Sequence, residues 1–236
     1  MKLGIISDIH GNWPALEAVV RQAKKVDGFL CLGDIVNYGP HPVQCVEWVQ
    51  KHVWSGWIVQ GNHDRALGLD EDPRCSEPYR EMAAAMQAYT ASQLNFQHKE
   101  YLASLPVSGN LLINDAKVVF FHAAPSDPLY AYVPKDDSRQ WSDETVFAHH
   151  PDFLLVGHTH TAFVRQYGET TVINPGSVGQ TKDGSRGACY AIWDGYEVEL
   201  CQADYDVKSV IRDLQPCAPE PIVQRLSKIL LTGGRM

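Results

Sequence analysis

The sequence has no long apolar run, which argues against a membrane-spanning protein. No segment of the 236 residues approaches the roughly 18 consecutive apolar residues that suggest a membrane span. The apolar run within residues 1–8 is too short for a secretory signal peptide, because acidic and histidine residues interrupt it at once. Internal repeats and low-complexity tracts are also missing. We therefore expect a cytoplasmic protein.

Paired cysteines and an excess of positive charge are missing too. None of the six cysteines forms a C-x-x-C pair, so we expect free thiols that pack as small apolar side chains. The 20 Lys and Arg residues against 28 Asp and Glu residues give a formal net charge of -8. An acidic chain gains little attraction to nucleic acid or anionic membranes, so neither is expected as a stable partner. A phosphate substrate stays compatible, because bound cations supply local positive charge.

The length and composition fit an ordinary globular protein. Apolar residues make up 44% of the chain and charged residues 20%. A chain of this length can bury a core without disulfides. We predict a single domain over residues 1–236, and the length also fits one domain with an inserted subdomain.

The first half of the chain alternates strand and helix signals. Residues 3–7 and 29–32 are continuous apolar runs typical of buried strands. Residues 14–25 and about 42–51 carry apolar residues at helical spacing, and a further strand is expected at residues 56–59. This alternation predicts an α/β fold with parallel strand pairing.

The rest of the chain divides into a helical stretch, a set of strands and a helical end. Residues 67–105 are rich in good helix formers and indicate a helical insertion. Its apolar positions are expected to pack helices together, with a lid that shapes substrate choice as the alternative. Three hairpin turns then separate predicted strands. Residues 207–231 form a mostly helical C-terminal segment. The hairpin turns are Asn114-Asp115, Gly168-Glu169 and Asp194-Gly195.

Side chains that bind metals follow five of the predicted strands. In open α/β folds, sites collect at the carboxyl ends of strands. Imidazole and carboxylate together suit Mn²⁺, Fe, Zn²⁺, Ni²⁺ or Co²⁺ better than Ca²⁺. The D-x-H and H-x-H spacings place two side chains on one side of a strand end, and one carboxylate can bridge two ions. Gly33, Gly61 and Gly157 are expected to let the backbone turn sharply before a ligand.

These residues together resemble the motif set of the calcineurin-like metallophosphoesterases. The resemblance runs from Leu3 to about Trp193, with the motifs in the order of that family. It implies two facing mixed β-sheets flanked by helices. Residues 174–179, with Gly184 later, look like the compact prokaryotic phosphodiesterase branch. The motifs are Asp8-x-His10, Gly33-Asp34 with Gly39 beyond it, Gly61-Asn62-His63-Asp64, His122, and Gly157-His158-Thr159-His160.

The resemblance also implies a role for each motif residue. His63 would contact the phosphate and protonate the leaving oxygen, and Asp64 would orient and charge His63. Two divalent ions are implied, with Mn²⁺ expected first and Fe, Zn²⁺, Ni²⁺, Co²⁺ or Mg²⁺ as alternatives. The first ion would be held by Asp8, His10 and His160, the second by Asn62, His122 and His158, and Asp34 would bridge the two.

Two ions about 3.5–4 Å apart favour in-line attack of a metal-bound hydroxide at phosphorus. We therefore predict hydrolysis of small phosphodiesters or phosphomonoesters, with Asn62, His63 and Arg65 contacting the substrate. A surface position is the alternative for Arg65. A phosphoprotein phosphatase, a dinucleoside polyphosphate hydrolase and a non-catalytic scaffold stay open as alternatives. The first is disfavoured because residues 34–40 lack the arginine that Ser/Thr phosphatases carry there. The physiological substrate and the oligomeric state stay open.

Overall fold

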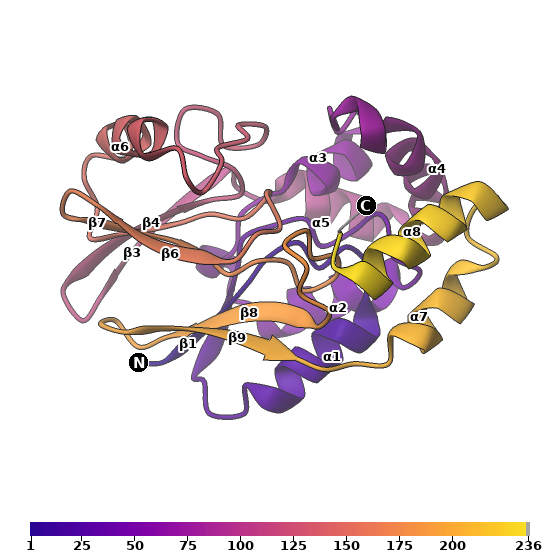
Figure 1. Ribbon diagram of the computed structural model, residues 1–236, viewed down its shortest axis with the longest axis horizontal. Coiled ribbons are helices and arrows are strands. Elements are labelled where there is room, and N and C mark those ends of the chain that lie inside the picture. The colour runs from indigo at the N-terminus through magenta and orange to yellow at the C-terminus, as the bar shows by residue number, and fades with distance from the viewer. Residues whose placement is uncertain (235–236) are drawn as a thin grey trace.

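The computed structural model describes residues 1–234 and contains two mixed β-sheets that face each other (Figure 1). The first sheet has the strand order β2-β1-β8-β9. Strand β1 (Leu3–Ile6) pairs in parallel with β2 (Gly28–Cys31) and antiparallel with β8 (Ala188–Trp193). Strand β9 (Val198–Ala203) closes the sheet antiparallel to β8. The parallel pairing predicted for the first two strands is confirmed.

The second sheet has the strand order β3-β4-β5-β7-β6. Its three central strands run parallel: β4 (Ala116–Phe121), β5 (Phe153–Leu155) and β7 (Thr170–Asn174). Strands β3 (Ser108–Ile113) and β6 (Phe163–Tyr167) lie antiparallel at the two edges. The three predicted turns therefore form hairpins, in β3–β4, β6–β7 and β8–β9.

An apolar layer fills the space between the two sheets. Leu3, Ile5 and Trp193 from the first sheet pack in one cluster with Phe120 and Ile173 from the second. All five side chains are fully buried. Burying such side chains contributes about 1.5–3 kcal/mol each, which makes this layer a main source of stability. The two facing mixed sheets that the resemblance implies are confirmed.

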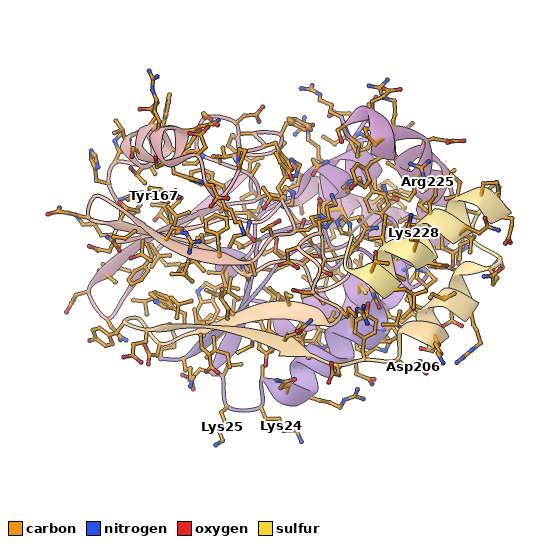
Figure 2. The ribbon with its side chains drawn as sticks, viewed as in Figure 1. Lys24, Lys25, Tyr167, Asp206, Arg225 and Lys228 are labelled. Carbon is orange, nitrogen blue, oxygen red and sulfur yellow. The ribbon has the colours of Figure 1, made fainter. Side chains whose placement is uncertain are left out.

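Helices cover the outer faces of both sheets (Figure 1). Helices α1 (Trp13–Gln22) and α2 (Pro42–His52) pack on the first sheet through a continuous apolar cluster. Helix α6 (Ser138–Phe147) packs on the second sheet through the buried ring of Trp141. Tyr167 on β6, seen below α6 in Figure 2, donates its hydroxyl hydrogen to the Lys135 carbonyl oxygen at 2.9 Å. The fold thus has helices outside and sheets inside.

The helices of the middle and of the C-terminal end pack against each other. Helices α4 (Glu77–Gln93), α7 (Val207–Leu214) and α8 (Glu220–Thr232) share one buried cluster. The side chain of Arg225 on α8, labelled in Figure 2, lies 3.4 Å from the Glu81 carboxylate of α4. Helix α5 (Phe96–Ser104) follows α4 and packs instead against α2 and α3 (Asn62–Leu69). Within residues 1–234, no helix combines the length and apolar character that crossing a bilayer requires.

The segment before the third motif differs from the sequence-based expectation. The strand predicted at residues 56–59 is wrong: the chain forms a 3-10 helix, η1 (Ser55–Trp57), and only Ile58 makes an isolated bridge, to Cys31. The chain then turns into α3 (Asn62–Leu69), which begins five residues before the predicted helical insertion. The third motif therefore forms the first turn of a helix. Helix α6 was also not predicted, because its sequence is polar and its apolar spacing weak. That the chain is one domain stays a prediction.

Candidate metal centre

Four loops and one helix bring the predicted ligands together. The loops follow β1, β2, β4 and β5, and the helix is α3, whose first turn carries Asn62. Every one of these ligand side chains is buried except that of His158, which is partly exposed. The structure divides six of the ligands into two groups with metal-binding geometry. The groups are Asp8 with His10 and His160, and Asp34 with His122 and His158.

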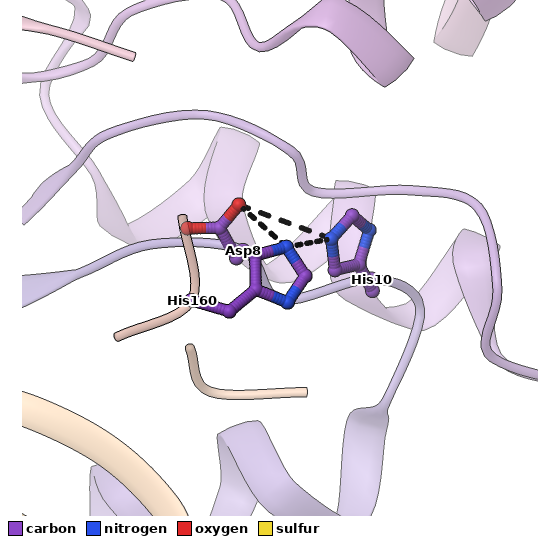
Figure 3. Close-up of side chains that lie close together, drawn as sticks. All are labelled: Asp8, His10 and His160. Atoms are coloured by element: carbon purple, nitrogen blue, oxygen red, sulfur yellow. Dashed lines mark hydrogen bonds and ion pairs between the residues drawn. The ribbon is translucent and has the colours of Figure 1, made fainter. Parts of the chain in front are cut away.

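The first group leaves three acceptor atoms facing one another (Figure 3). His160 Nε2 lies 3.1 Å from His10 Nε2 and 3.2 Å from Asp8 Oδ1. The Nδ1 atoms of the two imidazoles meet the backbone carbonyls of Val36 and Gln180, to which they donate hydrogen. Their Nε2 atoms therefore present lone pairs. Asp8 Oδ1 is buried without a hydrogen-bond partner. A cation held among these atoms would satisfy all three.

The second group centres on His122. Its Nε2 lies 3.1 Å from Asn62 Oδ1, 3.2 Å from His158 Nδ1 and 3.3 Å from Asp34 Oδ2. Its Nδ1 lies 2.7 Å from the Leu32 carbonyl oxygen, so the carbonyl orients the ring. The amide oxygen of Asn62 adds a further candidate ligand atom beside this group. The predicted ligands of the second ion are therefore brought together.

Asp34 lies between the two groups. Its Oδ2 is 3.3 Å from His122 Nε2 and 3.8 Å from His10 Nε2, one imidazole from each group. Its Oδ1 accepts a hydrogen bond from the backbone N–H of His63 at 2.9 Å. The position suits a carboxylate that bridges two ions. Within each group, the candidate ligand atoms lie within 4.8 Å of one another, and the donor set fits a pair of divalent transition-metal ions.

Five ligands have left-handed backbone conformations, which cost non-glycine residues roughly 1–2 kcal/mol each. Neighbouring loops hold these conformations through hydrogen bonds. The Asp8 N–H donates to the Gly33 carbonyl at 3.0 Å, and the His10 N–H donates to the Asp34 carbonyl at 2.9 Å. The ligands are thus fixed in place by the fold itself. Their φ values are 53° for Asp8, 48° for His10, 55° for Asp34, 62° for His158 and 56° for His160.

The motif glycines serve two different purposes. Gly33 has a φ of 87°, so the expected sharp turn before a ligand holds there. Gly61 has an ordinary φ of -88°, yet a Cβ atom at this residue would lie 2.1 Å from Asp34 Oδ1. A Cβ at Gly157 would lie 2.0 Å from the Ser7 hydroxyl oxygen. These two glycines allow the close approach of two chain segments and do not need positive φ.

Burial and charge set the protonation of the ligands. Burial lowers the pKa of His10 well below its usual value and that of His158 to about 3, so both rings are neutral. For His122, burial opposes protonation, but Asp34 outweighs it and raises the pKa to about 9. Burial would raise the pKa of Asp34, yet the surrounding imidazoles lower it well below its usual value. In the metal-free protein, His122 is therefore protonated on both ring nitrogens and positively charged at neutral pH.

His63 has an amide as its partner. Its Nδ1 lies 2.8 Å from Asn37 Nδ2, while Asn37 Oδ1 accepts a hydrogen bond from the Tyr38 N–H at 2.8 Å. The second contact fixes which way the amide faces, so Asn37 donates to His63 Nδ1. The hydrogen of the neutral ring is then on Nε2, which lies 3.5 Å from Cys75 Sγ. Burial lowers the pKa of His63 to about 4, which agrees with a neutral ring.

Asp64 has a different place from the one expected. Its Oδ2 accepts hydrogen bonds from the N–H groups of Asp34 at 2.8 Å and Gly61 at 3.0 Å, and its Oδ1 accepts from Ile35 at 2.8 Å. The prediction that it orients His63 is wrong, because both oxygens are used on backbone amides. Burial, with the charge of Asp34, raises the pKa of Asp64 to about 7. Asp64 fastens the loop after β2 to the start of α3.

A cavity of about 220 Å³ opens beside both ligand groups, and His63 lines it. Arg65, predicted to contact phosphate, does not line it. Its guanidinium forms two hydrogen bonds with Glu71, at 2.9 and 3.2 Å. Lys182 and Arg74 are the cations of this cavity, and sequence reasoning missed both. Neither follows a strand or belongs to a motif used above, so no pattern in the sequence pointed to them. The first turn of α3 lines the cavity too, and its amide groups favour anions.

Comparison with known proteins shows the family of this chain. The calcineurin-like phosphoesterase superfamily domain matches residues 1–196 of the chain. The protein belongs to this superfamily. It is 31% identical to an uncharacterised protein, MJ0912, of Methanocaldococcus jannaschii, over 95% of this chain and 96% of that one. The family predicted from the motifs is confirmed, and members of this phosphoesterase superfamily typically bind divalent metal ions.

Two solved structures share the fold over its whole length. One is a metallophosphoesterase from Sphaerobacter thermophilus, 30% identical, with a TM-score of 0.80, covering 100% of this chain and 99% of that one. The other is a hypothetical protein, PH1004, from Pyrococcus horikoshii OT3, 21% identical, with a TM-score of 0.85 and the same coverage. The likeness to these two structures therefore includes the part of the chain beyond residue 196.

Proposed function

We propose that this protein is a dinuclear-metal-dependent phosphoesterase that hydrolyses small phosphodiesters or phosphomonoesters. The observation that carries the proposal is Asp34, which lies between two buried ligand groups next to a cavity lined by His63. Mn²⁺ is the first candidate for both positions. The proposed ligands are Asp8, His10 and His160 for one ion, Asn62, His122 and His158 for the other, and Asp34 for both.

The residues around the cavity have different roles in the proposed hydrolysis. Two divalent ions, once bound, polarise the phosphoryl group and lower the pKa of water. The Lys182 ammonium, which lines the cavity, attracts the negatively charged phosphoryl oxygens. Asn37 keeps the ring hydrogen of His63 on Nε2, facing the cavity. His63 can then place that hydrogen against the leaving oxygen and stabilise the charge that develops there.

Two predicted roles change with the structure. We assign phosphate contact to Lys182 in place of Arg65, since the Arg65 guanidinium is paired with Glu71 outside the cavity. We assign Asp64 a positioning role, since its carboxylate holds the N–H groups of Asp34 and Gly61 in place. We assign the orientation of the His63 ring to Asn37, whose side-chain amide donates to His63 Nδ1.

The test is hydrolysis of bis-p-nitrophenyl phosphate and p-nitrophenyl phosphate by wild type and His63→Ala. Each protein is assayed as purified, after removal of metal, and after Mn²⁺ is added back. We expect activity that requires metal and that falls about 100-fold or more in His63→Ala, the loss typical of removing such a group. Activity that survives complete metal removal would contradict the proposal. Two bound ions without hydrolysis of either ester would favour a selective phosphatase or a scaffold.

A further inference from the structure

The wall of the cavity away from the metal ligands combines aromatic rings with cations. The Arg74 guanidinium carbon lies 4.4 Å from the centre of the Tyr130 ring, and the Lys182 ammonium lies 4.5 Å from the centre of the Tyr79 ring. Within residues 1–234, neither cation forms a salt bridge with a carboxylate. Each cation is held over an aromatic face with its charge available to a ligand.

Tyr132 adds an open ring to the same wall. Its ring centre is 6.0 Å from that of His158, one of the metal ligands, and 58% of the residue is exposed. At this place, next to the ligand groups and on the cavity, it offers a stacking surface to whatever organic group is attached to the phosphate.

The cavity continues outward past the Arg74–Tyr130 pair. Both residues also line a second hollow of about 470 Å³, which Glu71 and Asp72 border as well. Arg65, paired with Glu71, lines this hollow too, so its two carboxylates and two guanidinium groups leave no net positive charge to hold a second phosphate. An uncharged ring with hydrogen-bond donors suits it better, because carboxylates accept such bonds. The metal ligands and Lys182 therefore favour a phosphoryl group, while the Tyr132 ring and the Arg74–Tyr130 pair, which lines both spaces, favour a neutral, flat group.

We propose, building on the function proposed above, that this site selects nucleoside monophosphate esters. The phosphoryl group lies between the metal ligands and Lys182, and the base stacks on Tyr132 and the Arg74–Tyr130 pair. A sugar separates the base from the phosphate and extends it toward the Arg74–Tyr130 pair that lines both spaces. A ring joined directly to the ester oxygen, as in phosphotyrosine, lacks this spacer.

The test compares two ligands that differ only in the base. Binding of AMP, ribose 5-phosphate and inorganic phosphate to the Mn²⁺-loaded protein is measured by calorimetry, with phosphate release assayed in parallel to account for turnover. We expect AMP to bind about tenfold more tightly than ribose 5-phosphate, within the range for stacking of one base on an aromatic side chain. The preference should shrink to about twofold in Tyr132→Ala and in Arg74→Ala.

Two variants separate stacking from general damage. Tyr132→Phe keeps the ring and should keep the preference for AMP. Tyr196→Ala removes an exposed tyrosine from the turn between β8 and β9. This residue does not line the cavity, so the preference for AMP should stay unchanged. Equal binding of AMP and ribose 5-phosphate overturns the inference alone. Tighter binding of O-phosphotyrosine than of AMP also overturns it. Failure of all three phosphates, inorganic phosphate included, overturns the proposed function together with it.

Discussion

Replacing Asn37 with Asp should change how His63 ionises. In the wild type, the Asn37 amide donates to His63 Nδ1 at 2.8 Å, and burial lowers the pKa of His63 to about 4. An aspartate at this position cannot donate and instead favours a proton on Nδ1. An opposite charge at such a distance raises an imidazole pKa by about 1–3 units. The pKa of His63 should therefore rise from about 4 into the range of about 5–7.

The assay is kcat/KM against pH for phenyl phosphate and p-nitrophenyl phosphate, between about pH 4.5 and 8.5 with saturating Mn²⁺. Phenolate leaves poorly, since its conjugate acid resembles tyrosine with a pKa of about 10, and it gains most from a proton donor. In Asn37→Asp, the protonated ring exists below the new pKa and is lost above it. We expect the ratio of phenyl to p-nitrophenyl hydrolysis to rise as pH falls through the range of about 5–7.

Asn37→Gly is the matched control. Asn37 has a φ of 73°, which glycine adopts without strain, so this variant removes the amide and adds no charge. It should lower kcat for both esters without adding an ionisation between about pH 5 and 7. If Asn37→Asp shows no new ionisation in that range, or if Asn37→Gly shows the same one, then Asn37 does not control the protonation of His63.

Three other predictions concern neighbouring residues. Gly61→Ala places a Cβ 2.1 Å from Asp34 Oδ1, so we expect loss of at least one Mn²⁺ by metal analysis and about 100-fold lower activity; an active protein with two ions would contradict this. Because the pKa of His122 is raised to about 9 in the metal-free protein, metal binding must release its proton, and affinity should rise up to about tenfold per pH unit toward pH 9. Calorimetry in buffers of different ionisation enthalpy measures that proton, and equal affinity at about pH 6.5 and 8.5 would refute it. Arg65→Ala should leave kcat/KM within about twofold, whereas Lys182→Ala should raise KM about tenfold; steady-state kinetics that reverse this order would restore Arg65 as the phosphate contact.

That the candidate metal ligands lie close together was predictable because their signal is local. Each follows a strand or a glycine at a fixed spacing, as Asp8-x-His10 does, and the order of the motifs constrains the set further. The two facing sheets followed from the same resemblance. The strand expected at residues 56–59 was wrong because tertiary context decided the outcome. Gly61 must approach Asp34 closely, and the chain turns into α3 after one bridge, whatever the strand propensity of Ile58 and Val59.

The contacts of His63 and Asp64 were not predictable in this way. Asp64 follows His63 directly, which made it the natural candidate to orient the ring. The actual partner, Asn37, comes from the loop after β2, and the contact exists only because that loop crosses the start of α3. The residues of the cavity wall are harder still to predict from sequence, because Arg74, Tyr132 and Lys182 come from three segments far apart in the chain. No periodicity connects such residues until the fold brings them together.

The candidate ligands with left-handed backbone conformations lower the stability of the folded protein. At Asp8, His10, Asp34, His158 and His160, glycine would fit the backbone better than the residue present. Without selection for metal binding, replacing these residues with glycine would raise stability. Such replacements would remove the candidate metal ligands. Selection for thermostability without selection for activity should act in the same direction. Keeping all five candidate ligands therefore costs this chain stability that glycine at the same positions would not cost.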